Sequence, residues 1–214
     1  IDFKALEVFV LDEADTMLDM GFFNDVQNII SKLPKNRQTL LFSATMPAEI
    51  EILADAILTN PTKVQVAAKT VTIDLVNQSV YHLEKSNKVP LLFNILGEPE
   101  HEKVLIFCKT KYGADIIVKA LEDASITAAS LHSGKTQAMR EEALQNFKES
   151  TLKILVATDV AARGIDVDNI TLVINYNLPE DPRNYIHRIG RTTRAGKSGM
   201  AISFAVENDM RQLN

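Results

Sequence analysis

The sequence predicts an α/β fold built on a parallel sheet, and two patterns support that prediction. Apolar runs of strand length recur along the 214 residues, and stretches with apolar residues on one helical face lie between them. The runs are apolar throughout, which is typical of parallel strands that helices cover on both faces. The composition, 46% hydrophobic and 24% charged, is that of an ordinary globular protein.

The individual elements follow from these patterns in chain order. Strands are expected where β-branched and aromatic residues concentrate, and helices where apolar residues recur three and four positions apart. Pro47 and Pro182 suit the first turn of a helix, and Asp181 is a candidate N-cap for the second of these helices. The expected strands are 6–11, 39–44, 79–84, 103–108, 153–158, 171–176 and 200–205, and the expected helical faces are 22–33, 50–58, 114–121, 139–147 and 182–189.

One stretch interrupts this alternation. From Lys63 to Gln78 there is neither a helical face nor a turn cluster, so we place an interdomain linker at 67–76. Residues 1–66 then supply three strands and two helices, too few for a complete doubly wound domain, whereas residues 77–214 supply enough for one. The first residue is not Met and an apolar strand begins within six residues, which is typical of a piece of a longer chain.

The composition excludes several classes of protein. With 8 Gly, 7 Pro and 1 Cys, the chain is not a collagen, a disordered segment or a disulfide scaffold. Cys108 lies inside an apolar run, which favours a small buried side chain over a nucleophile and fits a reducing compartment. The sequence has no apolar run of the ~18–20 residues that span a membrane, and no signal-peptide pattern. We therefore expect a cytoplasmic protein without a membrane partner.

The charge is distributed unevenly along the chain. Residues 1–60 carry 10 acids and 4 bases (net −6), whereas residues 61–214 carry 18 acids and 19 bases (net +1). The segment HRIGRTTRAGKSG (187–199) is basic, and planar guanidinium groups pair with phosphate oxygens, so it is a candidate phosphate-binding site. A solvated basic helix end is the alternative interpretation. The arginines concerned are spaced by three: Arg188, Arg191 and Arg194.

An acidic cluster, Asp12-Glu13-Ala14-Asp15, follows directly on the first strand. In open α/β sheets the ligand crevice lies at the carboxyl ends of the strands, so these carboxylates are expected near a ligand. Such an Asp can hold Mg²⁺ through oxygen or water, and an adjacent Glu can deprotonate a water molecule. The same acids are equally typical of a helix start favoured by the helix dipole.

Three other motifs are excluded by spacing. GK(S/T) occurs at 134–136 and 196–198, but a P-loop also needs Gly five residues before the Gly-Lys pair, where this sequence has Ala129 and Arg191. No GxGxxG follows any strand, which excludes a dinucleotide-binding oxidoreductase. His132 and His187 lack a second His or Cys at metal-ligand spacing, so no zinc site is expected.

Four motifs in order identify a resemblance: DEAD (12–15), SAT (43–45), VATDVAARGIDV (156–167) and HRIGRTTR (187–194). Over essentially the whole chain, the sequence resembles the DEAD-box RNA helicases of superfamily 2, from motif II to just beyond motif VI. The segment VNQSVYHLEKSNK (76–88) resembles the sequences of bacterial members of the RhlE type. The resemblance implies a truncated RecA-like lobe in residues 1–66 and a complete one in residues 77–214.

The resemblance also implies a function. We expect ATP-dependent RNA binding, RNA-stimulated ATP hydrolysis and duplex unwinding, with ATP and Mg²⁺ as cofactors. The RNA partner would be single-stranded or a short duplex, bound with little sequence specificity. The alternative is a non-catalytic module that binds RNA or a protein partner. Because the P-loop precedes motif II in the family, the chain as given is expected to be inactive alone.

The roles that the resemblance implies fall on matching positions. Asp12 corresponds to the acid that holds Mg²⁺, through water, and Glu13 to the base that activates the attacking water. Asp166 corresponds to the acid that binds the ATP ribose, and Arg191 and Arg194 to the arginine fingers. The residues that couple the two lobes would be Asp15, Ser43, Thr45 and His187, and those that grip RNA phosphates and sugars would be Thr110, Gly134, Arg140, Thr158 and Gly164.

One position departs from the family's motif VI, which usually reads HRIGRTGR. Here Thr193 replaces the second Gly. Because Thr reaches positive φ only at a steric cost, we expect an altered approach of Arg194 to phosphate.

Overall fold

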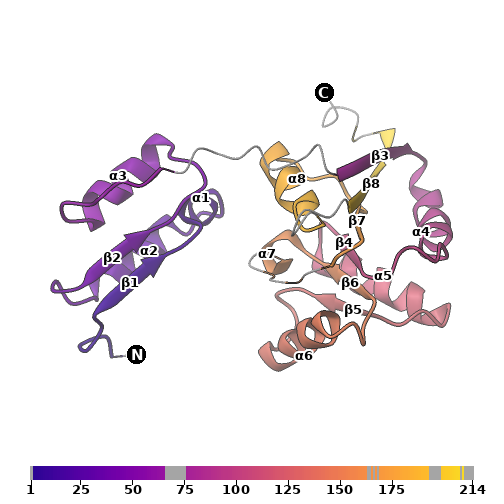
Figure 1. The fold of residues 1–214 in the computed structure, drawn as a ribbon, viewed down its shortest axis with the longest axis horizontal. Helices are drawn as coiled ribbons and strands as arrows, with labels where there is room; N and C mark the ends of the chain where they lie inside the picture. Colours follow the sequence, from indigo (N-terminus) through magenta and orange to yellow (C-terminus); the bar gives the residue numbers. More distant parts are fainter. Residues whose placement is uncertain are drawn as a thin grey trace. The chain divides into compact units, whose positions relative to one another are not determined.

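The α/β class with parallel sheets is confirmed by a computed structural model (Figure 1). It describes residues 2–65, 76–162, 165, 167, 169–192, 199–207 and 209. The chain divides into two compact units, Ile1–Val66 and Ala67–Asn214. Among the described residues, no helix has the length and apolar character needed to cross a membrane.

The first unit contains a small parallel sheet with helices on one face. Strands β1 (Val8–Leu11) and β2 (Gln38–Leu41) pair in parallel, and helices α1 (Ala14–Asp19), α2 (Phe23–Ser31) and α3 (Ala48–Ile57) pack against them. The core between sheet and helices consists of Leu11, Ala14, Val26, Ile50, Leu53 and Ile57.

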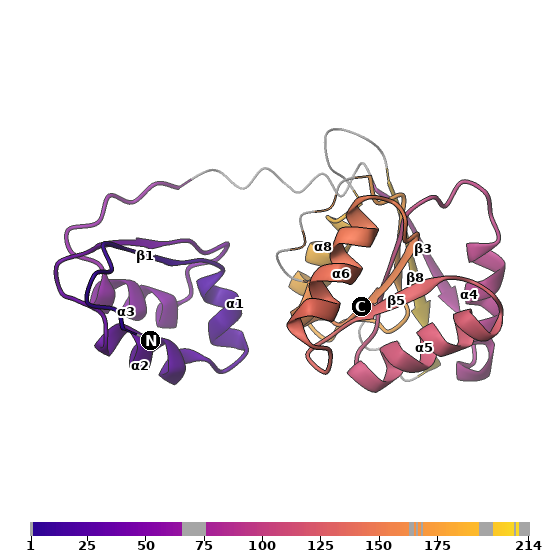
Figure 2. The same ribbon diagram turned by 90° about the horizontal axis from the view of Figure 1, so that it is seen from below.

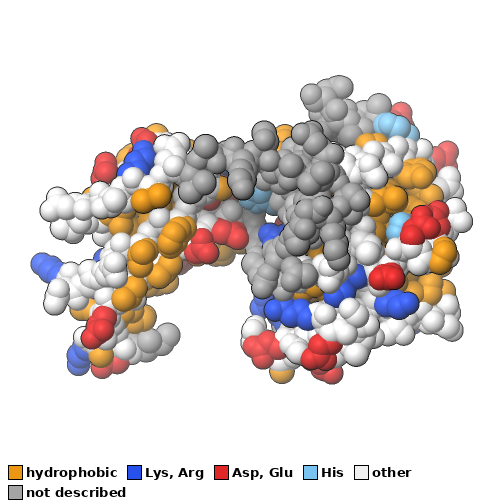
Figure 3. Space-filling view, in the orientation of Figure 1, with side chains coloured by type: hydrophobic (Ala, Val, Ile, Leu, Met, Phe, Trp, Pro, Cys, Tyr) orange, Lys and Arg blue, Asp and Glu red, His pale blue; other side chains and the backbone are white. Residues whose placement is uncertain are grey.

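The opposite face of this small sheet is apolar and exposed. Hydrophobic side chains gather over β1 and β2 (Figure 3), where Val8, Val10 and Phe42 are each about half exposed (50%, 51% and 53%). The expected three strands and two helices were wrong for this unit, whose described residues form two strands and three helices. Residues 59–65 form no strand and do not pair with β1 or β2. The acidic cluster follows the end of β1 and also begins helix α1, so both interpretations of it apply.

The second unit is built on a six-stranded sheet in the order β3-β8-β7-β4-β6-β5, with every pair parallel. Strand β5 was missed in the sequence because Ala-Ala-Ser-Leu carries no β-branched or aromatic residue. Strand β3 begins at Val76, which the expected linker had included. The strands are β3 (Val76–His82), β4 (Val104–Phe107), β5 (Ala128–Leu131), β6 (Ile154–Ala157), β7 (Leu172–Asn175) and β8 (Gly199–Ala205).

Helices cover both faces of this sheet (Figure 2). Helices α4 (Lys88–Leu96), which follows the short 3₁₀ turn η2 (Lys85–Asn87), and α5 (Lys111–Asp123) pack on one face. Helices α6 (Gln137–Lys148), α7 (Asp159–Ala162) and α8 (Pro182–Ile189) pack on the other. The expected N-cap of α8 is confirmed, because the Asp181 carboxylate accepts a hydrogen bond from the Arg183 amide at 2.8 Å.

The strand order places the loops that carry the motifs side by side. Strands β7, β4, β6 and β5 are successive neighbours and parallel, so the segments after their carboxyl ends emerge at one edge of the sheet. These segments begin at Tyr176, Cys108, Thr158 and His132 respectively.

Candidate functional site

The acidic cluster and the SAT segment lock together in the first unit. The Thr45 backbone amide and its hydroxyl both donate to Asp15 Oδ2 at 2.8 Å, and the Asp15 amide donates to Ser43 Oγ at 3.1 Å. Ser43 Oγ in turn donates to the Thr45 carbonyl at 2.7 Å. The structure therefore brings together Asp15, Ser43 and Thr45, the expected coupling residues of this unit.

The Asp15 carboxylate is buried, with 7% of the residue exposed, and it is held in its charged form. Burial by itself raises the pKa of this carboxyl, but the hydrogen bonds from Thr45, Ser43 and the Thr16 amide outweigh burial and leave the pKa below its usual range. A charged acceptor at this point fixes the SAT segment to the start of helix α1.

Asp12 and Glu13 lie at the junction between β1 and α1. Glu13 is the N-cap of α1 with φ 50° and ψ 46°, a left-handed conformation that is uncommon for a residue with a side chain. The Glu13 amide donates to Asp12 Oδ1 at 2.8 Å, and Asp12 is exposed. Carboxylate oxygens at an exposed strand end are suitable ligands for Mg²⁺, so the donor set fits the implied ion.

In the second unit, Arg188 of helix α8 joins the segment after β6 to the end of β7. Its Nε and Nη2 atoms donate to the two carboxylate oxygens of Asp159 at 2.6 and 2.7 Å. Its Nη1 atom donates to Asn175 Oδ1 at 3.0 Å and to the Asn177 carbonyl at 2.7 Å. The guanidinium carbon also lies 5.0 Å from the centroid of the Phe107 ring. Arg188 is therefore a buried structural connector instead of a solvated cation.

The roles of Asn175 and Asp159 were missed in the sequence. Asn175 is fully buried at the end of β7, and its amide nitrogen donates to Ser203 Oγ on β8 at 3.1 Å. The sequence does contain a signal for Asn175: it is a polar residue inside the apolar run TLVINY, and a buried side-chain amide needs specific hydrogen-bond partners.

The segment after β4 is shaped by its own side chains. Thr110 Oγ1 accepts from the Gly113 amide at 3.0 Å and caps helix α5. A Cβ on Gly113 would lie 2.7 Å from Cys108 Sγ, so a larger residue at this position would force the buried Cys108 side chain to shift. Cys108 is buried as expected, and burial raises the pKa of its thiol.

The segment after β5 forms a tight turn around a buried histidine. The Gly134 amide donates to His132 Nδ1 at 3.1 Å, and the Lys135 amide donates to the His132 carbonyl at 3.1 Å. Thr136 Oγ1 then caps helix α6 by accepting from the Met139 amide at 3.3 Å. A Cβ on Gly134 would lie 3.0 Å from His132 Nδ1, which gives this glycine a local structural reason as well.

Arg140 and Thr158 complete the described part of the expected RNA set. Arg140, on the first turn of α6, donates from Nη1 to Gln137 Oε1 at 3.2 Å. Its Nε is a buried side-chain nitrogen with no hydrogen-bond partner among the described residues. The Thr158 carbonyl accepts from the Ala161 and Ala162 amides at 3.1 and 2.9 Å and starts helix α7.

Of the remaining expected residues, the structure describes His187 and Arg191. His187 is exposed on α8, and Arg191 Nη1 donates to the Ile165 carbonyl at 3.0 Å, so Arg191 is tied to the VATDVAARGIDV segment. The other expected positions lie outside the described residues: Gly164, Asp166, Thr193 and Arg194.

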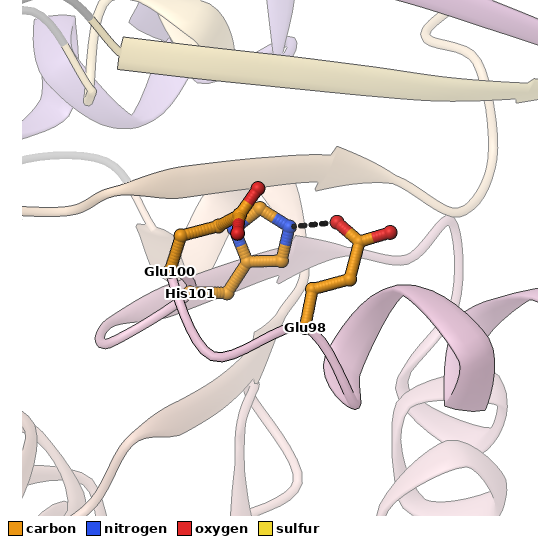
Figure 4. Close-up of side chains that lie close together, drawn as sticks. All are labelled: Glu98, Glu100 and His101. Carbon is orange, nitrogen blue, oxygen red and sulfur yellow. Dashed lines mark hydrogen bonds and ion pairs between the residues drawn. The ribbon is translucent and has the colours of Figure 1, made fainter.

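A further group of possible ligands lies between α4 and β4 (Figure 4). Glu98, Glu100 and His101 place ligand atoms within 4.8 Å of one another, and Glu98 Oε2 lies 3.1 Å from His101 Nε2. The two glutamates are exposed, and the contact between Glu98 and the buried histidine ring pins the chain after helix α4.

Comparisons with known proteins agree with the motif order. The family model described as DEAD/DEAH box helicase matches residues 1–53, and the helicase conserved C-terminal domain matches residues 87–196. The DEAD-box ATP-dependent RNA helicase CshA of Bacillus subtilis is 44% identical over 213 residues, which is 100% of this chain and 43% of that protein. CshA of Bacillus licheniformis is 44% identical over 209 residues, 97% of this chain and 43% of that protein.

Solved structures are similar over the whole chain. Saccharomyces cerevisiae Dbp5 bound to RNA and ADP BeF3 matches with 33% identity and a TM-score of 0.85, covering 100% of this chain and 57% of that chain. A DEAD box protein from the hyperthermophile Methanococcus jannaschii matches with 38% identity and a TM-score of 0.62, again over 100% and 57%. The chain thus spans less than half the length of the curated relatives reported above, 43% of each. It belongs to the DEAD-box ATP-dependent RNA helicase family and contains part of the DEAD domain followed by the helicase C-terminal domain.

Proposed function

We propose that the chain supplies part of the ATP site and part of the RNA site of an ATP-dependent RNA helicase that unwinds duplexes. One observation carries the proposal: the family's RNA-gripping positions Thr110, Gly134 and Thr158 follow three neighbouring parallel strands and emerge at one edge of the sheet. A relative with the same fold, Dbp5, has been solved with RNA bound.

The proposed RNA site would contact the sugar–phosphate backbone of the RNA. Arg140 supports this proposal, because its buried Nε donor has no acceptor among the described residues and a phosphate oxygen would satisfy it. Contacts with phosphates, sugars and 2′-hydroxyls give little base specificity, so we expect weak binding of single-stranded RNA that fades as salt rises. Equal affinity for an RNA oligomer at about 50 and 300 mM salt would contradict this assignment.

For the nucleotide, we propose the residue roles that the family resemblance implies in each unit. Asp12 would hold Mg²⁺ through water and Glu13 would accept a proton from the attacking water, while Mg²⁺ when bound screens the phosphate charge. Asp166 would bind the ribose, and Arg191 and Arg194 would stabilise charge on the γ-phosphate. The bond between Arg191 and the Ile165 carbonyl supports a fixed position for the first of these arginines.

We propose that Asp15 and His187 have the coupling role that the family resemblance implies. The carboxylate of Asp15 is fixed by Thr45, and His187 is exposed on α8. In a helicase that carries this chain together with a P-loop, a double-mutant cycle with Asp15→Ala and His187→Ala should give non-additive losses of RNA-stimulated ATP hydrolysis. Additive losses would contradict the coupling.

A polypeptide of these 214 residues alone should not hydrolyse ATP, because its sequence has no GxxxxGK(S/T) pattern for a loop that would hold the β- and γ-phosphates. The assay is phosphate release with ATP, Mg²⁺ and RNA, and Glu13→Gln is the control for contaminating ATPases. Turnover that disappears in the Glu13→Gln variant would contradict the proposal. A different result would favour a non-catalytic RNA-binding module: the chain binds RNA, but a helicase that carries it together with a P-loop does not hydrolyse ATP.

Three finer assignments concern the source, the cellular compartment and the subgroup of the family. We propose a bacterial, cytoplasmic protein, which the identity to the Bacillus helicases supports. The RhlE subgroup stays a prediction from the wording of residues 76–88, since the relatives reported above carry the name CshA.

A further inference from the structure

The His132 ring is held in one orientation by hydrogen bonds at both of its nitrogens. Its Nδ1 accepts a hydrogen bond from the Gly134 amide at 3.1 Å, and a ring nitrogen that accepts carries no proton. With Nδ1 as an acceptor, the other ring nitrogen, Nε2, is the donor to Asp115 Oδ1 at 3.0 Å. Only 3% of the His132 side chain is exposed, so water does not replace either partner.

Asp115, on helix α5, is the hydrogen-bond partner of His132 Nε2. Its Oδ1 also accepts from Ser130 Oγ on β5 at 2.7 Å and lies 3.0 Å from Lys135 Nζ. Burial raises the pKa of the Asp115 carboxyl, but hydrogen bonds from His132, Ser130 and Lys135 outweigh burial and hold the pKa well below its usual range. The carboxylate is therefore charged at neutral pH and ties α5, β5 and the following turn together.

The ring also sets the shape of the turn that leads into helix α6. A Cβ on Gly134 would crowd the ring, at 3.0 Å from Nδ1. The Gly134 amide is bonded to Nδ1 and the Lys135 amide to the His132 carbonyl, so two successive amides are used inside the turn. Thr136 then caps α6, whose first turn carries Arg140. The chain of contacts runs from Asp115 through His132 to the segment that carries two expected RNA ligands.

We propose that Asp115 and His132 are positioning residues for RNA: the ring holds the turn 132–136 so that Gly134 and Arg140 meet the RNA backbone. This inference rests on the proposed RNA-binding function. The charged groups near the ring are Asp115 on α5, Lys135 in the turn and Lys111 at the start of α5.

Two variants of one residue separate the two ring nitrogens. In His132→Asn the side-chain oxygen stands where Nδ1 stood and can accept from Gly134. In His132→Gln the amide reaches Asp115 instead, and the acceptor for Gly134 is lost. Binding of a single-stranded oligouridine is measured by anisotropy with the full chain at about pH 8. We expect roughly fivefold to tenfold weaker binding for His132→Gln and near-unchanged binding for His132→Asn.

A second measurement does not depend on RNA. Hydrogen exchange of the Gly134 amide should be slow in the unaltered chain and in His132→Asn, and fast in His132→Gln, while exchange in strand β4 reports that each variant is folded. Fast exchange in all three proteins, or equal protection in all three, would overturn the inference.

Rescue by the conservative variant distinguishes positioning from a merely structural role. His132→Asn should keep the affinity for RNA that His132→Gln loses, although both variants remove the ring. Equal losses of affinity in the two variants would refute the inference, whereas absence of RNA binding by the unaltered chain would refute the proposed function instead.

Discussion

Replacing Arg188 by Met should destabilise the second unit severely. The substitution keeps most of the aliphatic stem but removes the guanidinium that bridges Asp159, Asn175 and the Asn177 carbonyl. Breaking a buried ion pair costs ~3–5 kcal/mol, and the lower half applies here because 30% of the Asp159 side chain is exposed. Leaving the fully buried Asn175 oxygen without its donor adds ~1–3 kcal/mol.

The expected loss is therefore ~4–7 kcal/mol, a large part of the ~5–15 kcal/mol that stabilises a typical domain. The matched control is Arg183→Met in the same helix, where the ion pair with Asp181 is exposed (side chains 50% and 33% exposed) and should contribute less than ~1 kcal/mol.

The assay uses a convenient property of the sequence. All 4 tyrosines lie in the second unit, at positions 81, 112, 176 and 185, so tyrosine fluorescence during urea unfolding of the full chain reports that unit alone. A cycle with Asp159→Asn should show a coupling energy above ~1.5 kcal/mol. If Arg188→Met destabilised the unit no more than Arg183→Met, our account of Arg188 as a buried connector would be wrong.

Two further predictions concern single contacts. Gly113→Ala should destabilise the second unit by ~1–3 kcal/mol, because its Cβ would meet Cys108 Sγ at 2.7 Å, and adding Cys108→Ala should restore most of the loss in urea unfolding; equal losses with and without it would contradict the clash. Thr45→Val should raise the pKa of Asp15, because two of the hydrogen bonds that lower it come from Thr45 and the variant lacks the hydroxyl. Since the folded pKa is depressed, Asp15 stabilises the first unit above its unfolded pKa of ~3.9, and this stability is lost as pH falls through the folded pKa. Carboxyl ¹³C titration should show that loss beginning at higher pH in the variant, and an unchanged titration would contradict the prediction.

The fold class and the family could be read from the sequence because both depend on local order along the chain. Continuous apolar runs such as KVLIFC and KILVAT determine buried parallel strands, and the motifs from DEAD to HRIGRTTR follow one another in the family's order. Strand β5 escaped detection because its residues have weak strand propensity and become a strand only by pairing with β6.

The contacts that organise the site were decided by the tertiary structure. Asp115 and His132 are 17 residues apart, Asp159 and Arg188 are 29 apart, and Asp15 and Thr45 are 30 apart. In each pair one polar group is buried by packing that no local pattern reports, and burial then demands a partner with matching hydrogen-bond geometry. The sequence by itself determined which residues carry charge and in what order, whereas only the folded sheet determined which of them meet, because parallel strands bring distant segments to one edge.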